Sequence, residues 1–177
     1  MGEGTRKRHP HGEVRAVAQV LDVAAYILDQ LASEGQQRVS AMKLQKLCYY
    51  AYGHHLAWEE RRLFPEHFEA WANGPVCPAL YAKHRGRFEL SRGDINGDPR
   101  ELDDGERESV DLVLDAYGPL SAHQLSAMTH QDGPWVLARR RAGVKPLERS
   151  DERLRDDEIA EYFDALATAS AADGQQG

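Results

Sequence analysis

The stretch AMKLQKLCYYAYGHHLAW, residues 41–58, decides the fold, because it predicts a helix with one apolar, aromatic and sulfur-lined inner face. The side chains on this face recur at helical spacing: Leu44, Leu47, Cys48, Ala51, His55 and Trp58. Ser40 stands where an N-cap is needed. Gly53 costs a helix interior about 1 kcal/mol relative to Ala, which indicates either close approach of a neighbouring element or a slight kink. We expect this helix to be the centre of the core.

Helical patterns continue on both sides of this segment. An apolar stripe begins near Val14 and ends before Gly35, where Gly is typical of a helix C-terminus. Ser121 and Gln124 form the pattern of a capping box, and Pro134 suits the first position of a helix. Further helices are predicted over 79–84, 106–117, 121–130 and 135–141, with a last one through Ile159, Phe163 and Leu166.

The segment FEAWANGPV, residues 68–76, breaks the helical pattern. Phe68, Ala70 and Ala72 alternate with Glu69 and Trp71 as in a short strand, and Asn73-Gly74 favours a sharp turn before Pro75. A further short strand is expected around 88–90. The predicted fold is mainly α, a single compact helical domain with a minor short β element around residues 67–72. The domain is expected over 13–168, between a disordered leader (1–12) and a disordered tail (169–177).

Composition excludes several classes of protein. The chain has 177 residues, 29% of them charged, and no apolar run approaches the ~18–20 residues of a membrane helix. The basic start is not followed by the apolar stretch of a secretory signal. Cys48 and Cys77 are too few for a disulfide-stapled secreted domain, so we expect them to be reduced. These features predict a cytoplasmic protein without a membrane partner.

Motifs of catalysis and cofactor binding are missing from the sequence. There is no HExxH and no Cys/His quartet for zinc, no GxSxG nucleophile elbow, and neither GxxxxGK[ST] nor GxGxxG for phosphates. Adjacent His54 and His55, and the pair His55 and Glu59, have spacings that select no particular metal. We therefore predict no enzyme activity, no cofactor and no metal site.

Three motifs in order resemble one family. MKLQKLCYYAYGHHLAW (42–58), LFPEHFEAWANGPVCPALYAKH (63–84) and LSAHQLSAMTHQDGPWVLAR (120–139), followed by IAEYF (159–163), are similar to the Panacea domain of SocA-like antitoxins. The resemblance implies a stand-alone antitoxin of a bacterial or prophage toxin–antitoxin system that neutralises a cognate protein toxin by direct binding. It also implies an alternative in which the protein is an adaptor that delivers the toxin to the ClpXP protease. A homodimer stays open, and no catalytic residues carry over.

A second alternative is an autoregulator that binds DNA. The helices predicted over 106–117 and 121–130, joined at Gly118, have the form of a helix-turn-helix, and Arg139–Arg141 follow. Nucleic acid is nevertheless an unfavoured partner, because residues 91–177 carry 10 basic against 19 acidic side chains.

The charge asymmetry instead suits a basic protein partner. Aromatic anchors and carboxylates are therefore the candidate partner-binding residues, although the area that a tryptophan buries favours a core position for each of the two tryptophans. The candidates are Trp71, Asn73, Tyr81, Trp135, Asp103, Asp104 and Glu106.

Overall fold

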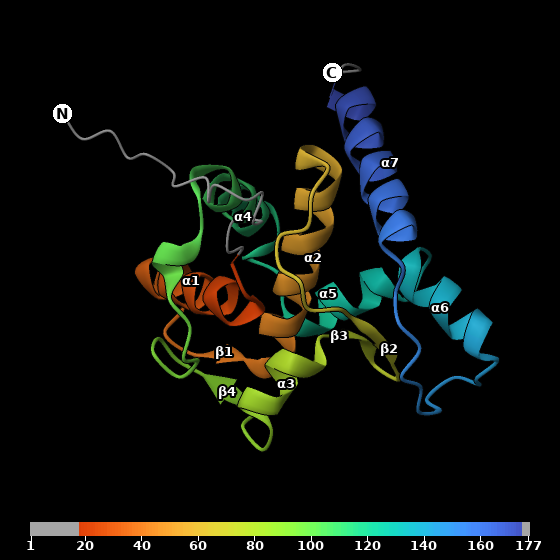
Figure 1. The fold of residues 1–177 in the computed structure, drawn as a ribbon, viewed down its shortest axis with the longest axis horizontal. Coiled ribbons are helices and arrows are strands. Elements are labelled where there is room, and N and C mark those ends of the chain that lie inside the picture. The colour runs from red at the N-terminus through yellow and green to blue at the C-terminus, as the bar shows by residue number, and fades with distance from the viewer. Residues whose placement is uncertain (1–17, 175–177) are drawn as a thin grey trace, which may run out of the picture.

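The computed structural model describes residues 18–174, so the leader expected over 1–12 lies outside the described residues. In chain order the elements are α1 (Val20–Ser33), β1 (Val39–Ser40), α2 (Ala41–Glu59), β2 (Glu69–Trp71), β3 (Gly74–Val76), α3 (Pro78–His84), β4 (Glu89–Leu90), a 3-10 turn (Pro99–Glu101), α4 (Asp104–Tyr117), α5 (Ala122–Thr129), α6 (Pro134–Ala142) and α7 (Asp156–Gly174). Helices dominate, and two small antiparallel strand pairs complete the fold (Figure 1), which confirms the mainly α class. Within 18–174, no helix combines the length and the hydropathy that crossing a membrane requires.

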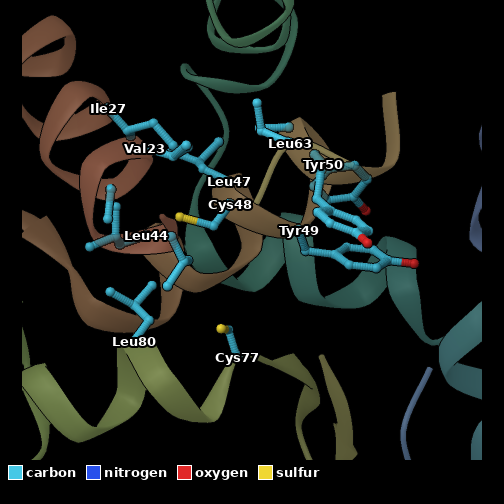
Figure 2. Packing of buried hydrophobic residues seen from close by; sticks show 14 of the residues in the cluster. Val23, Ile27, Leu44, Leu47, Cys48, Tyr49, Tyr50, Leu63, Cys77 and Leu80 are labelled. Atoms are coloured by element: carbon cyan, nitrogen blue, oxygen red, sulfur yellow. The ribbon is translucent and has the colours of Figure 1, made fainter. Parts of the chain in front are cut away.

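Helix α2 is the centre of the core. Helices α1, α4, α5 and α7 all pack against it, and the Ser40 side chain caps it by accepting a hydrogen bond from the Lys43 backbone N–H at 3.1 Å. Figure 2 shows Leu47 and Cys48 on the side of α2 that faces α1, with Tyr49 and Tyr50 on the other side. The prediction that Trp58 lies on the inner face is wrong. Its side chain is 42% exposed, because the buried part of α2 ends at His55.

Two helices have boundaries that differ from those that the sequence predicts. Helix α1 begins at Val20 rather than near Val14, because Gln19 and Asp22 form a capping box there, with the Gln19 N–H donating to Asp22 Oδ2 at 2.8 Å. Residues 14–17 lie outside the described residues. Helix α7 continues to Gly174 and so includes most of the segment that was expected to be a tail, while 175–177 are not described.

Three buried polar side chains in the first two turns of α2 hold distant segments to the helix. The Lys43 ammonium donates to the Gly118 carbonyl at 2.6 Å, at the turn between α4 and α5. The Gln45 amide binds the backbone of Cys77, and the Lys46 ammonium donates to the Pro75 carbonyl at 3.1 Å. Since buried carbonyls need partners, these bonds fix β3 and the start of α3 relative to the central helix.

The predicted short strand is one arm of a hairpin. Strand β2 pairs antiparallel with β3, and its other edge receives residues 152–154, where the Ala70 N–H donates to the Glu152 carbonyl at 2.8 Å. Pro75 lies opposite Ala70 in this hairpin. Proline has no N–H to donate, and the pairing tolerates it because Ala70 directs its N–H to Glu152 and its carbonyl to Arg139, so Ala70 needs no donor from Pro75.

Candidate partner-binding site

A pocket of about 520 Å³ lies between the start of α2, the β2–β3 hairpin, α3 and the segment 149–151. It brings together three of the predicted partner-binding residues, Trp71, Asn73 and Tyr81. Met42, Gln45 and His84 also line it, and the periodicity of the sequence did not single these out. A volume of this size is in the range that accommodates a ligand group or several side chains of a partner.

Two aromatic rings form one wall of the pocket. Trp71 and Tyr81 are half-buried, and their ring centroids lie 4.9 Å apart in an edge-to-face arrangement at 69°. The indole N–H of Trp71 donates to Glu69 Oε1 at 2.9 Å, and the other oxygen of that carboxylate lies 2.8 Å from His67 Nε2. Both rings are therefore held in place while part of each surface stays accessible, which is the arrangement of an anchor for an apolar group.

The floor of the pocket is a hydrogen-bonded chain that begins at Gln45. Its Oε1 accepts from the Cys77 N–H at 2.9 Å, so its Nε2 is the donor to the Cys77 carbonyl at 3.2 Å and lies 3.0 Å from His84 Nε2. An amide donor requires an acceptor at His84 Nε2, so the imidazole is neutral, and burial lowers its pKa. The only feature of the sequence that could have indicated this floor is a Gln among the apolar residues of the central helix, and periodicity alone does not single it out.

Asn73 and Trp135 have different positions relative to the pocket. Asn73 is exposed at the tip of the hairpin, where its carbonyl accepts from Ser126 Oγ at 2.8 Å and ties the turn to α5. Trp135 is only 9% exposed, and its indole N–H donates to the Trp71 carbonyl at 2.8 Å. Trp135 thus supports β2 from within the protein and does not line the pocket.

The predicted carboxylates lie near the other end of α2. Asp103 and Glu106 form a capping box at the start of α4, and both pair with Arg61, which follows the C-terminus of α2. Glu106 is 1% exposed, so its carboxylate is part of the interior. Asp104 is exposed and pairs with Arg107. The structure therefore does not bring these three residues together with Trp71 and Tyr81.

The basic triplet on which the DNA hypothesis depends is not a surface stripe. Arg139 is buried and donates to the carbonyls of Ala70, Lys145 and Glu148 at 2.8–3.0 Å. Arg141 lies 2.5 Å from Glu158, leaving Arg140 as the exposed member of the triplet. In the part of the chain that the structure describes, no three His, Cys, Asp or Glu side chains converge as metal ligands would.

Comparison with known proteins identifies the class as antitoxins. The family described as "Antitoxin SocA-like, Panacea domain" matches residues 44–136, from α2 to the start of α6, and the chain belongs to this family. It is 34% identical over 137 residues to "Antitoxin SocA" of Caulobacter vibrioides (strain NA1000 / CB15N), which covers 70% of this chain and 68% of that protein. No solved structure matches significantly. Membership of an antitoxin family indicates a non-enzymatic role.

Proposed function

We propose that this protein neutralises a cognate protein toxin by direct binding, and that the pocket around Trp71, Asn73 and Tyr81 is the centre of the docking surface. The observation that carries the proposal is that the segment shared with the antitoxin family, 44–136, supplies both rings of the aromatic wall and the floor of this pocket. We place the complex in the cytoplasm, and the activity is binding without catalysis.

The geometry is favourable for affinity. Interface energy concentrates in a few aromatic or arginine anchors that fill well-packed pockets. Trp71 and Tyr81 are held by each other and by Glu69, and the floor is fixed by Gln45. Because these groups are ordered before the partner arrives, little side-chain entropy is lost on binding.

The test is co-expression of this protein with the toxin encoded by the neighbouring reading frame, followed by growth measurement and pull-down. Wild type should relieve the growth arrest and form a complex, whereas Trp71→Ala and Tyr81→Ala should weaken the complex at least about tenfold. Trp58→Ala is the matched control, because Trp58 is also partly exposed but lies at the far end of α2. Circular dichroism of each variant checks that the fold is intact.

The outcomes separate the mechanisms. Relief that persists in cells lacking ClpXP, with toxin levels unchanged, supports sequestration by binding. Relief that requires ClpXP, with toxin levels falling, would assign the adaptor mechanism instead. If wild type leaves the arrest unchanged, the antitoxin proposal is wrong.

A further inference from the structure

The turn between α3 and β4 presents an aromatic ring to solvent on a fixed backbone. Phe88 is 88% exposed, the highest value among the large apolar side chains of the described residues. Its carbonyl accepts from the Ala41 N–H at 2.8 Å, and the next residue, Glu89, pairs with Ser40 in the β1–β4 ladder. The Arg87 N–H donates to the His84 carbonyl at 2.8 Å. The ring is thus held out from the surface by backbone bonds, and its own side chain contributes little to the fold.

This turn adjoins the pocket. Ala41, which binds the Phe88 carbonyl, precedes Met42, and both Met42 and His84 line the pocket. Figure 1 shows α3, β4 and the turn that joins them at the same end of the molecule as the start of α2. Met42 is itself 38% exposed. Phe88, Met42 and the Trp71–Tyr81 wall are therefore parts of one face with one projecting and one concave apolar feature.

The charge of the turn is opposite to that of the whole chain. Residues 83–92 carry four basic side chains, Lys83, Arg85, Arg87 and Arg92, against one carboxylate, although the chain has a net charge of −7. Arg92 is paired with Asp29, and Arg87 approaches Asp94 at 3.8 Å. Lys83 and Arg85 are exposed and form no ion pair with any side chain among residues 18–171. Two carboxylates line the pocket: Glu69 binds Trp71 and His67, and the exposed Asp151 is offset in charge by Arg149, which lines the pocket too.

From this face we infer that the partner is a protein with an acidic docking surface. An apolar recess in the partner's surface receives the ring of Phe88, while a projecting group of the partner enters the pocket. The inference rests on the proposed function, since it names the chemistry of the toxin at the same site. Charge complementarity selects an acidic surface for Lys83 and Arg85, and a concave pocket beside a projecting ring fits a shaped protein surface, which a flat bilayer cannot match. This chemistry is opposite to the basic partner that the overall charge of the chain predicts.

The experiment compares three variants in the same co-expression and in binding kinetics with the purified toxin. Phe88→Ala should weaken the complex at least about tenfold, chiefly through faster dissociation. Lys83→Glu with Arg85→Glu should slow association about tenfold or more at low salt, and less at high salt. The matched control is Arg140→Glu with Lys145→Glu, which makes the same charge change on exposed residues at the end of α6. This control should bind like wild type.

Each outcome decides the inference. The inference is established by two results together. Binding is weakened in the first two variants but not in the control, and a toxin in which Asp or Glu is changed to Lys restores binding to the Lys83→Glu/Arg85→Glu variant. If wild type neutralises the toxin and these variants do so equally well, the inference is wrong while the proposed function stands. Retention of wild type, but not Phe88→Ala, on anionic lipid vesicles would assign the turn to a membrane and overturn it. If wild type does not neutralise the toxin, both proposals are wrong.

Discussion

Replacing Gly53 by Ala tests how α7 docks on the central helix. An added Cβ at Gly53 would lie 2.5 Å from Cζ of Phe163 and closer still to two other carbons of that ring. The ring of Phe163 is fully buried and makes edge-to-face contacts with Tyr49, Tyr50 and His54. It therefore cannot swing away without moving the aromatic cluster or α7 itself. Of the two explanations that the sequence left open for Gly53, close approach is the one that the structure supports.

Two opposing contributions determine the size of the effect. Ala is favoured over Gly in a helix interior by about 1 kcal/mol. Overpacking a well-filled core costs about 1–3 kcal/mol, and more where the neighbours are rigid. Because the required shift of the Phe163 ring is on the order of 1 Å within a cluster of aromatic rings, we expect overpacking to exceed the propensity gain. The net expectation is a loss of up to about 2 kcal/mol, or a melting temperature lower by up to roughly 8 °C for a chain of this size.

Thermal and chemical denaturation of four variants, Gly53→Ala, Gly105→Ala, Phe163→Leu and the double variant Gly53→Ala/Phe163→Leu, measure this balance. Gly105→Ala is the control for propensity, because an added Cβ there meets its nearest atoms at 3.5 and 3.6 Å, and it should not destabilise the protein. Gly53→Ala combined with Phe163→Leu should be less destabilised than the sum of the two single variants, since the smaller side chain makes room for the methyl group. A melting temperature that rises in Gly53→Ala alone would refute the packing of α7 against α2.

Three further predictions concern the core and its polar groups. Leu47→Ala should lower the free energy of unfolding by about 2–5 kcal/mol in denaturant, and wild-type stability would contradict the central place of α2. Trp135→Phe removes the 2.8 Å hydrogen bond to the Trp71 carbonyl and should cost about 1 kcal/mol with unchanged helix content by circular dichroism. Burial lowers the pKa of His54 and His55 from 6.5 to about 4, so stability that is complete above pH 6.5 should be lost as the pH falls toward 4. The free energy of unfolding should fall by up to about 3 kcal/mol per histidine, measured by denaturation at a series of pH values. The fall should be smaller in His55→Asn, which lacks one of the two imidazoles.

Local signals predicted the elements well, because capping and turn residues act within a few positions of themselves. Ser40 caps α2, Ser121 and Gln124 form their capping box, and Pro134 is at the start of α6. Gly74 adopts a positive φ of 126° at the turn that Asn73-Gly74 predicts. Each of these depends on chemistry that the sequence displays directly, so no knowledge of the tertiary fold is needed.

Tertiary partners were not predictable in the same way. Lys43 and Lys46 are absent from the inner face that periodicity predicts, but both are buried, and their ammonium groups donate hydrogen bonds to backbone carbonyls of the turn after α4 and of β3. The same limit explains Trp58, whose helical position matches the inner face although its side chain is 42% exposed. Burial at a given helical position depends on which segments reach it, and a single sequence does not contain that information.

The chemistry of the partner could not be predicted from the net charge of the chain, for the same reason. The acidic half of the chain predicts a basic partner only if its carboxylates are free to meet one. Instead, Asp103 and Glu106 cap α4 and hold Arg61, while Asp156 binds both Tyr52 and Arg62. The exposed cations Lys83 and Arg85 belong to the half of the chain that is nearly neutral by count, yet they flank His84, which lines the pocket with Trp71 and Tyr81. Charges already used inside the fold add to the net charge but contribute little to recognition, so the sign of the docking face follows from its own residues.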